Sequence, residues 1–83
     1  MEYIIAAYRS RNKAIEVFGS LTDSGYRCAL VSTPQSANVG CGLSLRLSVH
    51  DFHRLRPVLS KVASFAGYFR VTNVNGRTIL TSI

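Results

Sequence analysis

The sequence predicts an α+β fold, a ferredoxin-like βαββαβ two-layer sandwich with an extra strand from a C-terminal β-hairpin. The chain has 83 residues, enough for one two-layer core, so we expect a single domain over residues 1–83. Strand-like and helix-like apolar patterns follow one another along the chain in the order of that fold. The dipeptide Asn75-Gly76 lies between two β-prone runs, which is typical of a tight hairpin turn.

The first half of the chain predicts a strand, a helix and a second strand. Residues 2–8 form a short apolar and aromatic run, typical of a buried strand. A helix is expected from Ser10 to Ser24, with Ser10 as its N-cap and Gly25 as the left-handed residue after its end. The second strand covers residues 27–33 and stops at Pro34. The apolar face of the helix consists of Ala14, Ile15, Phe18 and Leu21.

The second half predicts a loop, a strand, a longer helix and the hairpin. Residues 34–42 are rich in small residues and form the loop. Residues 43–49 alternate apolar and polar, so Ser44, Arg46 and Ser48 face away from the core. A helix capped by Ser48 is expected to reach about Ala66, with a kink or a late start at Pro57 and its end at Gly67. Strands follow over residues 68–74 and 77–83. The apolar face of this helix consists of Phe52, Leu55, Leu59, Val62 and Ala66.

The predicted sandwich leaves one face and one edge of its sheet uncovered. Both helices cover the same face, so the other face is expected to be polar or to bind a partner. The last strand is expected at an edge and carries little charge to prevent pairing. A second copy of the chain is therefore one expected partner, in a homodimer.

Composition and charge restrict the partners and the cellular location expected for the protein. Ten Lys and Arg against four Asp and Glu give a formal charge of +6, which favours anionic partners. No run of about 18–20 apolar residues could span a membrane. The start of the chain lacks the pattern of a secretory signal, and two cysteines are too few for a disulfide framework. A cytoplasmic location is expected.

Cys41 is the strongest candidate for chemistry in the chain. It lies between Gly40 and Gly42 in the predicted loop, where no neighbouring side chain shields its sulfur. A thiolate there would be a nucleophile, and the alternative is a small buried residue in a tight turn. Cys28, by contrast, lies within an apolar strand and is expected in the core.

Other kinds of site are disfavoured. His50 and His53 are three residues apart, but four ligands would be needed for a closed zinc site, and we expect no metal. The strand that carries Arg46 has no aromatic residue to stack on bases, which argues against nucleic-acid binding. There is no phosphate-binding glycine loop and no legible catalytic triad or carboxylate pair. A thiol carrier or a binding module remains, and a stand-alone enzyme is disfavoured.

The sequence resembles a small bacterial family described as putative Se/S carrier protein-like. The residues that carry the resemblance are Ser32-Thr33-Pro34 and then Gly40-Cys41-Gly42-Leu43-Ser44-Leu45-Arg46, within a similarity from about Tyr3 to Ala66. The chain has Gln35 where the family commonly has arginine after the proline, and its hairpin over residues 68–83 extends beyond the usual end of the family.

This resemblance implies that Cys41 relays sulfur or selenium between a donor and an acceptor protein. The sulfur or selenium would be held covalently as a persulfide or selenosulfide, with no other cofactor. Pro34, Gly40, Gly42 and Arg46 would form the surrounding binding site. Gln35 in place of arginine puts anion stabilisation at that position in doubt. The alternative is a non-catalytic binding or regulatory module that forms homo-oligomers through its sheet.

Overall fold

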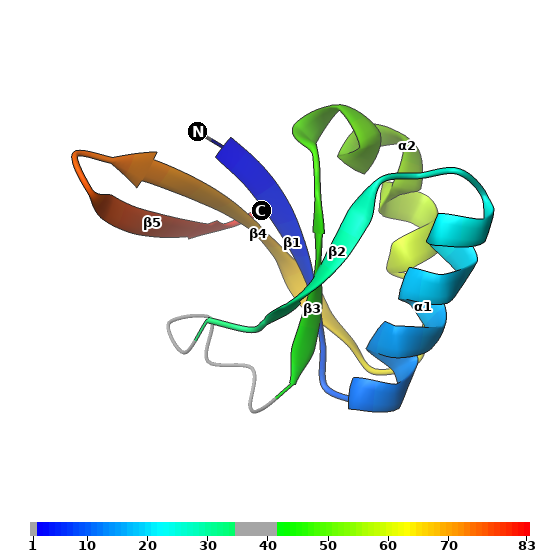
Figure 1. Ribbon diagram of the computed structural model, residues 1–83. Coiled ribbons are helices and arrows are strands. Elements are labelled where there is room, and N and C mark those ends of the chain that lie inside the picture. Colours follow the sequence, from blue (N-terminus) through cyan, green and yellow to red (C-terminus); the bar gives the residue numbers. More distant parts are fainter. Residues whose placement is uncertain (1, 35–41) are drawn as a thin grey trace.

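The computed structural model describes residues 2–34 and 42–83 and confirms an α+β fold (Figure 1). An antiparallel five-stranded sheet with the order β2-β3-β1-β4-β5 carries two helices on one face. No helix in these ranges is long and apolar enough to cross a membrane. The elements are β1 (Glu2–Tyr8), α1 (Arg11–Asp23), β2 (Cys28–Ser32), β3 (Leu43–Leu47), α2 (Val49–Leu59), β4 (Phe65–Val74) and β5 (Arg77–Ser82).

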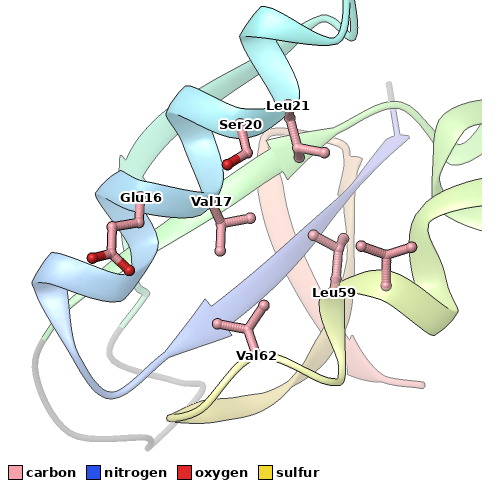
Figure 2. Close-up of a pocket in the computed structure, with 7 residues that line it drawn as sticks. Glu16, Val17, Ser20, Leu21, Leu59 and Val62 are labelled. Carbon is pink, nitrogen blue, oxygen red and sulfur yellow. The ribbon is translucent and has the colours of Figure 1, made fainter.

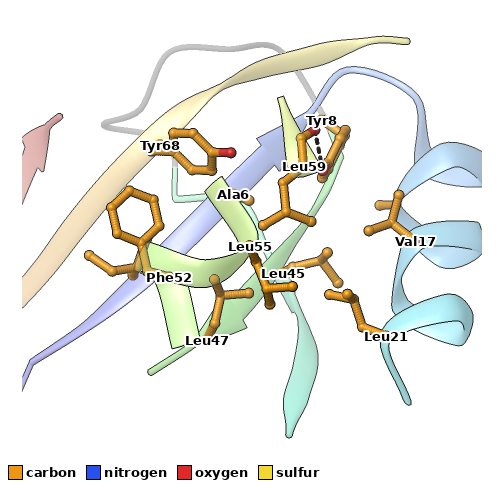
Figure 3. Packing of buried hydrophobic residues seen from close by; sticks show 12 residues of the cluster. Ala6, Tyr8, Val17, Leu21, Leu45, Leu47, Phe52, Leu55, Leu59 and Tyr68 are labelled. Atoms are coloured by element: carbon orange, nitrogen blue, oxygen red, sulfur yellow. Dashed lines mark hydrogen bonds between the residues drawn. The ribbon is translucent and has the colours of Figure 1, made fainter. Parts of the chain in front are cut away.

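The core lies between the sheet and the two helices (Figure 3). β1 is central, paired with β3 on one side and β4 on the other, and its alternate residues Ile4, Ala6 and Tyr8 point toward the helices. The hydroxyl of Tyr8 donates to the carbonyl of Leu59 at 3.1 Å, which ties β1 to the end of α2. A buried tyrosine keeps its polar atom satisfied in this way. The other buried members of the core are Ala14, Val17, Leu21, Leu45, Leu47, Phe52, Leu55 and Tyr68.

Both helices begin where the sequence predicts. The side chains of Ser10 and Ser48 accept hydrogen bonds from the backbone N–H groups of Lys13 and Asp51, so each is an N-cap. Gly25 follows α1 with φ +89°, as expected of a residue in the left-handed region.

The predicted end of the second helix at Ala66 is wrong. α2 stops at Leu59, two residues after Pro57, whose missing N–H removes one bond of the helical ladder. The chain then turns, and Phe65, the first residue of β4, pairs with Tyr8. Gly67 accordingly lies inside β4, opposite Ala7, and does not close a helix.

The hairpin is confirmed, although β4 begins three residues before the predicted Tyr68. Asn75 and Gly76 form the turn with φ +51° and +78°, the combination that a type I′ hairpin turn requires. Val74 and Arg77 are the first pair of the ladder that joins β4 to β5.

Ser64, between α2 and β4, is a strained residue. Its φ is +72°, and its buried hydroxyl has no hydrogen-bond partner among the residues that the structure describes. Its carbonyl accepts a 2.9 Å hydrogen bond from the N–H of Arg9, which holds it against the end of β1. Left-handed backbone costs a non-glycine residue about 1–2 kcal/mol, and an unpaired buried hydroxyl about 1–3 kcal/mol.

We therefore expect Ser64→Gly to stabilise the protein. The gain in the free energy of unfolding should be about 1 kcal/mol, because glycine removes both penalties at the cost of a more flexible unfolded chain. Urea unfolding measures it, and Ser64→Ala, which removes only the hydroxyl, separates the two effects. A less stable glycine variant would contradict this assignment of strain.

Buried tyrosines make the stability sensitive to alkaline pH. Burial is the main cause that raises the pKa of Tyr8 far above its ordinary value, with a smaller effect from Tyr68, and burial also raises the pKa of Tyr68. In the pH range just above 10 the folded state keeps protons that the unfolded state has lost, so stability falls as pH rises there. Urea unfolding at a series of alkaline pH values should show this fall. It should be shallower in Tyr8→Phe, and equal slopes would contradict the assignment.

Candidate functional site

The predicted loop leaves and rejoins the sheet at one closed base, formed by residues 33 and 42–44. The N–H of Thr33 donates to the carbonyl of Gly42 at 3.1 Å. The hydroxyls of Thr33 and Ser44 are hydrogen-bonded at 2.7 Å, and Ser44 is completely buried. The backbone bond extends the β2–β3 ladder by one step, to Thr33 and Gly42, and the bond between the hydroxyls links the same two strands.

Gly42 is packed against the end of β1 so closely that a side chain has no room. Its φ is +145°, and a Cβ atom there would lie 2.9 Å from the carbonyl oxygen of Tyr8. That oxygen belongs to the backbone of a strand paired with β4, so it cannot easily move away. Gly42 therefore fixes the point where the chain rejoins the fold, one residue after Cys41.

Three segments meet at this end of β1. Gly42 lies against Tyr8, the N–H of Arg9 binds the carbonyl of Ser64, and α1 begins at its cap Ser10. The base of the predicted loop thus lies where β1 and the start of α1 are tied to the turn before β4.

The structure brings together only some of the predicted site residues. Gly42 belongs to the closed base and Pro34 follows its residue Thr33 directly, whereas Gly40 and Cys41 lie outside the described residues. Arg46 lies four residues along β3 from Gly42, about 13 Å at the usual rise of a strand. Its guanidinium carbon lies 4.1 Å from the centre of the Tyr3 ring, in a cation–π contact.

Arg46 belongs to the sheet face that the helices leave uncovered. The registers of β1, β3 and β4 place Tyr3, Ile5, Arg46, Phe69 and Val71 on this face. Ile5 and Val71 are buried, while Tyr3, Arg46 and Phe69 are partly exposed. The face therefore mixes apolar and aromatic side chains with Arg46, Ser44 and Asn73, and its cover by a partner stays a prediction.

The structural roles of Thr33 and Ser44 are not visible in the sequence. The alternating pattern of β3 predicts that Ser44 faces away from the core, and the residue does lie on that side. Its full burial and its bond to Thr33 come from the cross-strand pairing of Val31 with Ser44, which places Thr33 next to Ser44. Such a pair is visible only once the strand register is known.

Cys28 has the surroundings of a structural thiol. It is partly buried and packs against the core cluster, as predicted from its position in an apolar strand. Burial raises the pKa of its thiol, which lowers the fraction of the reactive thiolate at neutral pH. Cys28 is therefore a weaker nucleophile at neutral pH than an exposed cysteine with an ordinary pKa.

A shallow pocket of about 280 Å³ lies between α1 and the end of α2 (Figure 2). Val17, Leu21 and Leu59 form its floor, and Glu16 and Ser20 are its polar residues. Its lining contains no thiol, histidine or basic side chain, so it offers a surface for apolar contact and no evident chemistry. In the ranges that the structure describes, no three His, Cys, Asp or Glu side chains gather as metal ligands.

The part of the chain from β1 to α2, with the closed loop base between β2 and β3, matches a known protein family. The family model described as Putative Se/S carrier protein-like matches residues 2–63. The chain belongs to this family. The Se/S carrier match runs from β1 to four residues past α2, so it includes Pro34, Cys41, Gly42 and Arg46, whereas β4 and β5 lie beyond it. Comparison with curated proteins and with solved structures gives no significant match.

Proposed function

We propose that the protein is a sulfur or selenium carrier and that Cys41 is the thiol that carries the atom. The observation that supports this most is membership of the Se/S carrier family over the segment that contains Cys41. The closed base at Thr33 and Gly42 supports it as well, because it holds the flanks of that segment against the end of β1. Cys28 is the poorer candidate because burial raises its pKa.

The proposed step is a thiolate attack that transfers one sulfur atom without net oxidation. The Cys41 thiolate attacks the outer sulfur of a donor persulfide, R–S–SH. A new S–S bond forms on Cys41, the S–S bond of the donor breaks, and the donor leaves as the thiolate R–S⁻. The proton on the outer sulfur passes to solvent, which leaves Cys41 as a persulfide anion. A donor R–S–SeH would give the selenosulfide by the same exchange.

Delivery is the same exchange in reverse. A thiolate of the acceptor protein attacks the outer sulfur or selenium, and the Cys41 thiolate leaves. The carrier returns to its starting state with no cofactor consumed. Pro34, Gly40 and Gly42 are proposed to keep the approach to Cys41 free of bulky side chains. The cytoplasm, where free thiols persist, is the compartment proposed for this cycle.

We assign Arg46 to contact with a partner. Its distance of about 13 Å along β3 from Gly42 favours a role on the open sheet face over stabilisation of an anion on Cys41. The formal charge of +6 would attract donor and acceptor proteins with acidic surfaces.

We also infer that the scaffold is ferredoxin-like, with β5 as an addition. Two features support this topology: the succession β1, α1, β2, β3, α2, β4 and the sheet order β2-β3-β1-β4. In that arrangement both helices pack on one face and leave the other for a partner.

Loading and discharge of the purified protein test the proposed function. Reduced protein is incubated with a small-molecule persulfide donor, and its intact mass is followed before and after addition of an acceptor thiol. We expect a gain of one sulfur atom that the acceptor thiol then removes. A protein that gains no sulfur at any donor concentration, under conditions where a control thiol protein is loaded, would overturn the proposal.

A further inference from the structure

The outer edge of β5 is a free sheet edge with unusually few features that would prevent pairing. Within residues 2–34 and 42–83, no strand pairs with this edge, and β5 packs substantially against β4 alone. Figure 1 shows the strand at the margin of the sheet, away from both helices. Between Thr78 and Ser82 there is no charge and no proline, and the ladder with β4 has no bulge. Natural proteins commonly protect edges by these devices.

The register identifies which backbone groups of β5 are free. The N–H of Ile83 donates to Tyr68 on β4. In an antiparallel ladder the N–H and C=O of one residue point to the same side, and the side alternates from residue to residue. Residues 77, 79, 81 and 83 therefore bond to β4, which leaves Thr78, Leu80 and Ser82 with N–H and C=O groups directed outward.

The side of this hairpin nearest the helices also carries exposed apolar side chains. On β4, Thr72 and Val74 lie on the same face of the sheet as the core residue Tyr68. Ile79 on β5 lies opposite Thr72 and therefore on that face too. Val74, Ile79 and Ile83 are 44%, 48% and 38% exposed, so neither helix reaches far enough to cover them. They form an apolar strip beside the free edge.

We propose that β5 pairs antiparallel with β5 of a second copy of this chain, across a two-fold axis at Leu80. The three outward-facing residues are spaced evenly about Leu80, so this register pairs all of them. Leu80 lies opposite Leu80 of the partner subunit, and Thr78 lies opposite Ser82 of the partner subunit. Each such pair exchanges two backbone hydrogen bonds, and the two sheets become one.

Side chains and charge favour a second copy as the occupant. In this register Ile79 lies opposite Thr81 of the partner subunit. Its diagonal neighbours are Ile79 of the partner subunit and Ile83 of the partner subunit. Apolar side chains of the two copies therefore meet on the exposed side of the hairpin. Arg77 is the one charged residue of β5 and lies at its start. The two copies of Arg77 are therefore at opposite ends of the interface, and no like charges face each other.

The test compares two lysine variants that change the charge equally on the same face of the hairpin. Ile79→Lys places a charge beside the two-fold axis, whereas Val74→Lys, at a site of nearly equal exposure, places it at the hairpin turn on β4. Light scattering after size exclusion and sedimentation equilibrium, both with reductant present, give the mass over a range of concentrations. Far-UV circular dichroism and thermal unfolding show that each variant is folded.

We expect the wild type to approach twice its 9.1 kDa mass as concentration rises, and Val74→Lys to behave alike. Ile79→Lys should raise the dissociation constant about tenfold or more. A wild type that stays monomeric up to about 1 mM, or an Ile79→Lys dimer as tight as that of Val74→Lys, would overturn the proposal.

Hydrogen exchange gives a second readout at single residues. The amides of Thr78, Leu80 and Ser82 should become protected only at concentrations where the dimer forms, whereas those of Ile79 and Thr81 should be protected throughout. A dimer in which the outward amides still exchange freely would place the interface elsewhere and overturn the proposal. If these amides become protected in a monomer, and only after an extended peptide is added, the partner of β5 is a peptide strand and not a second copy of the chain. That result would also overturn the proposal.

Discussion

A Cys41→Ser variant is expected to lose all sulfur loading while it keeps its fold. Serine has nearly the same size as cysteine, but its hydroxyl is not ionised at neutral pH and cannot hold a transferable sulfur. The substitution leaves unchanged the core residues and the hydrogen bond between Thr33 and Gly42, which hold the described fold. The unfolding midpoint should therefore stay within a few degrees of the wild type, whereas intact mass should show no added sulfur.

Cys28→Ser is the matched control for this prediction. It removes the other thiol of the chain, whose pKa is raised by burial. Loading should remain at the wild-type extent, although some stability is lost because a hydroxyl replaces a thiol that packs against the core. Loading that survives in Cys41→Ser and disappears in Cys28→Ser would show that Cys28, and not Cys41, is the carrier thiol.

Gly42→Ala is expected to be the most destabilising single-methyl change at a glycine of the described chain. The added Cβ would lie 2.9 Å from the Tyr8 carbonyl oxygen, and the backbone at φ +145° is one that L-residues rarely adopt. Relief requires movement of either β1 or the base at Thr33. We expect a loss of about 2–4 kcal/mol in the free energy of unfolding, measured with urea.

Gly25→Ala separates strain from collision in this prediction. Gly25 also has a positive φ, +89°, but nothing lies within 4 Å of a Cβ built there. Its substitution should cost only about 1 kcal/mol. Equal losses at the two glycines would show that the contact between Gly42 and Tyr8 contributes nothing. Loading of Cys41 can also be measured in Gly42→Ala at temperatures where this variant is folded. Slower loading there would show that the base positions the thiol in addition to stabilising the fold.

Local patterns predicted most of the fold because they are set by nearby residues. The two serine caps, the strand over residues 2–8 and the Asn75-Gly76 turn each depend on a few adjacent positions, and the structure confirms all of them. The end of α2 was predicted too late because the apolar spacing continues through Val62 and Ala66. Pro57 weakens the helix there, and the pairing of Phe65 with the distant Tyr8 then draws the following residues into β4.

The candidate site could be predicted in part for the same reason. Glycine on both sides of Cys41 and the proline before the loop are visible in the sequence, and so is the family resemblance. The contact of Gly42 with Tyr8, the bond between Thr33 and Ser44, and the stacking of Arg46 on Tyr3 join residues that are far apart in the chain. They follow from the strand register, which single-sequence patterns do not determine.

The most direct test of the carrier assignment is peptide mapping of the loaded protein. The protein is purified without reductant, treated with the persulfide donor, blocked with an alkylating agent and digested, and the peptides with Cys28 and Cys41 are analysed by mass spectrometry. The account predicts one added sulfur or selenium on the Cys41 peptide, removable by reductant, and none on the Cys28 peptide. An unmodified Cys41 peptide beside a modified Cys28 peptide, or no modification of either, would contradict it.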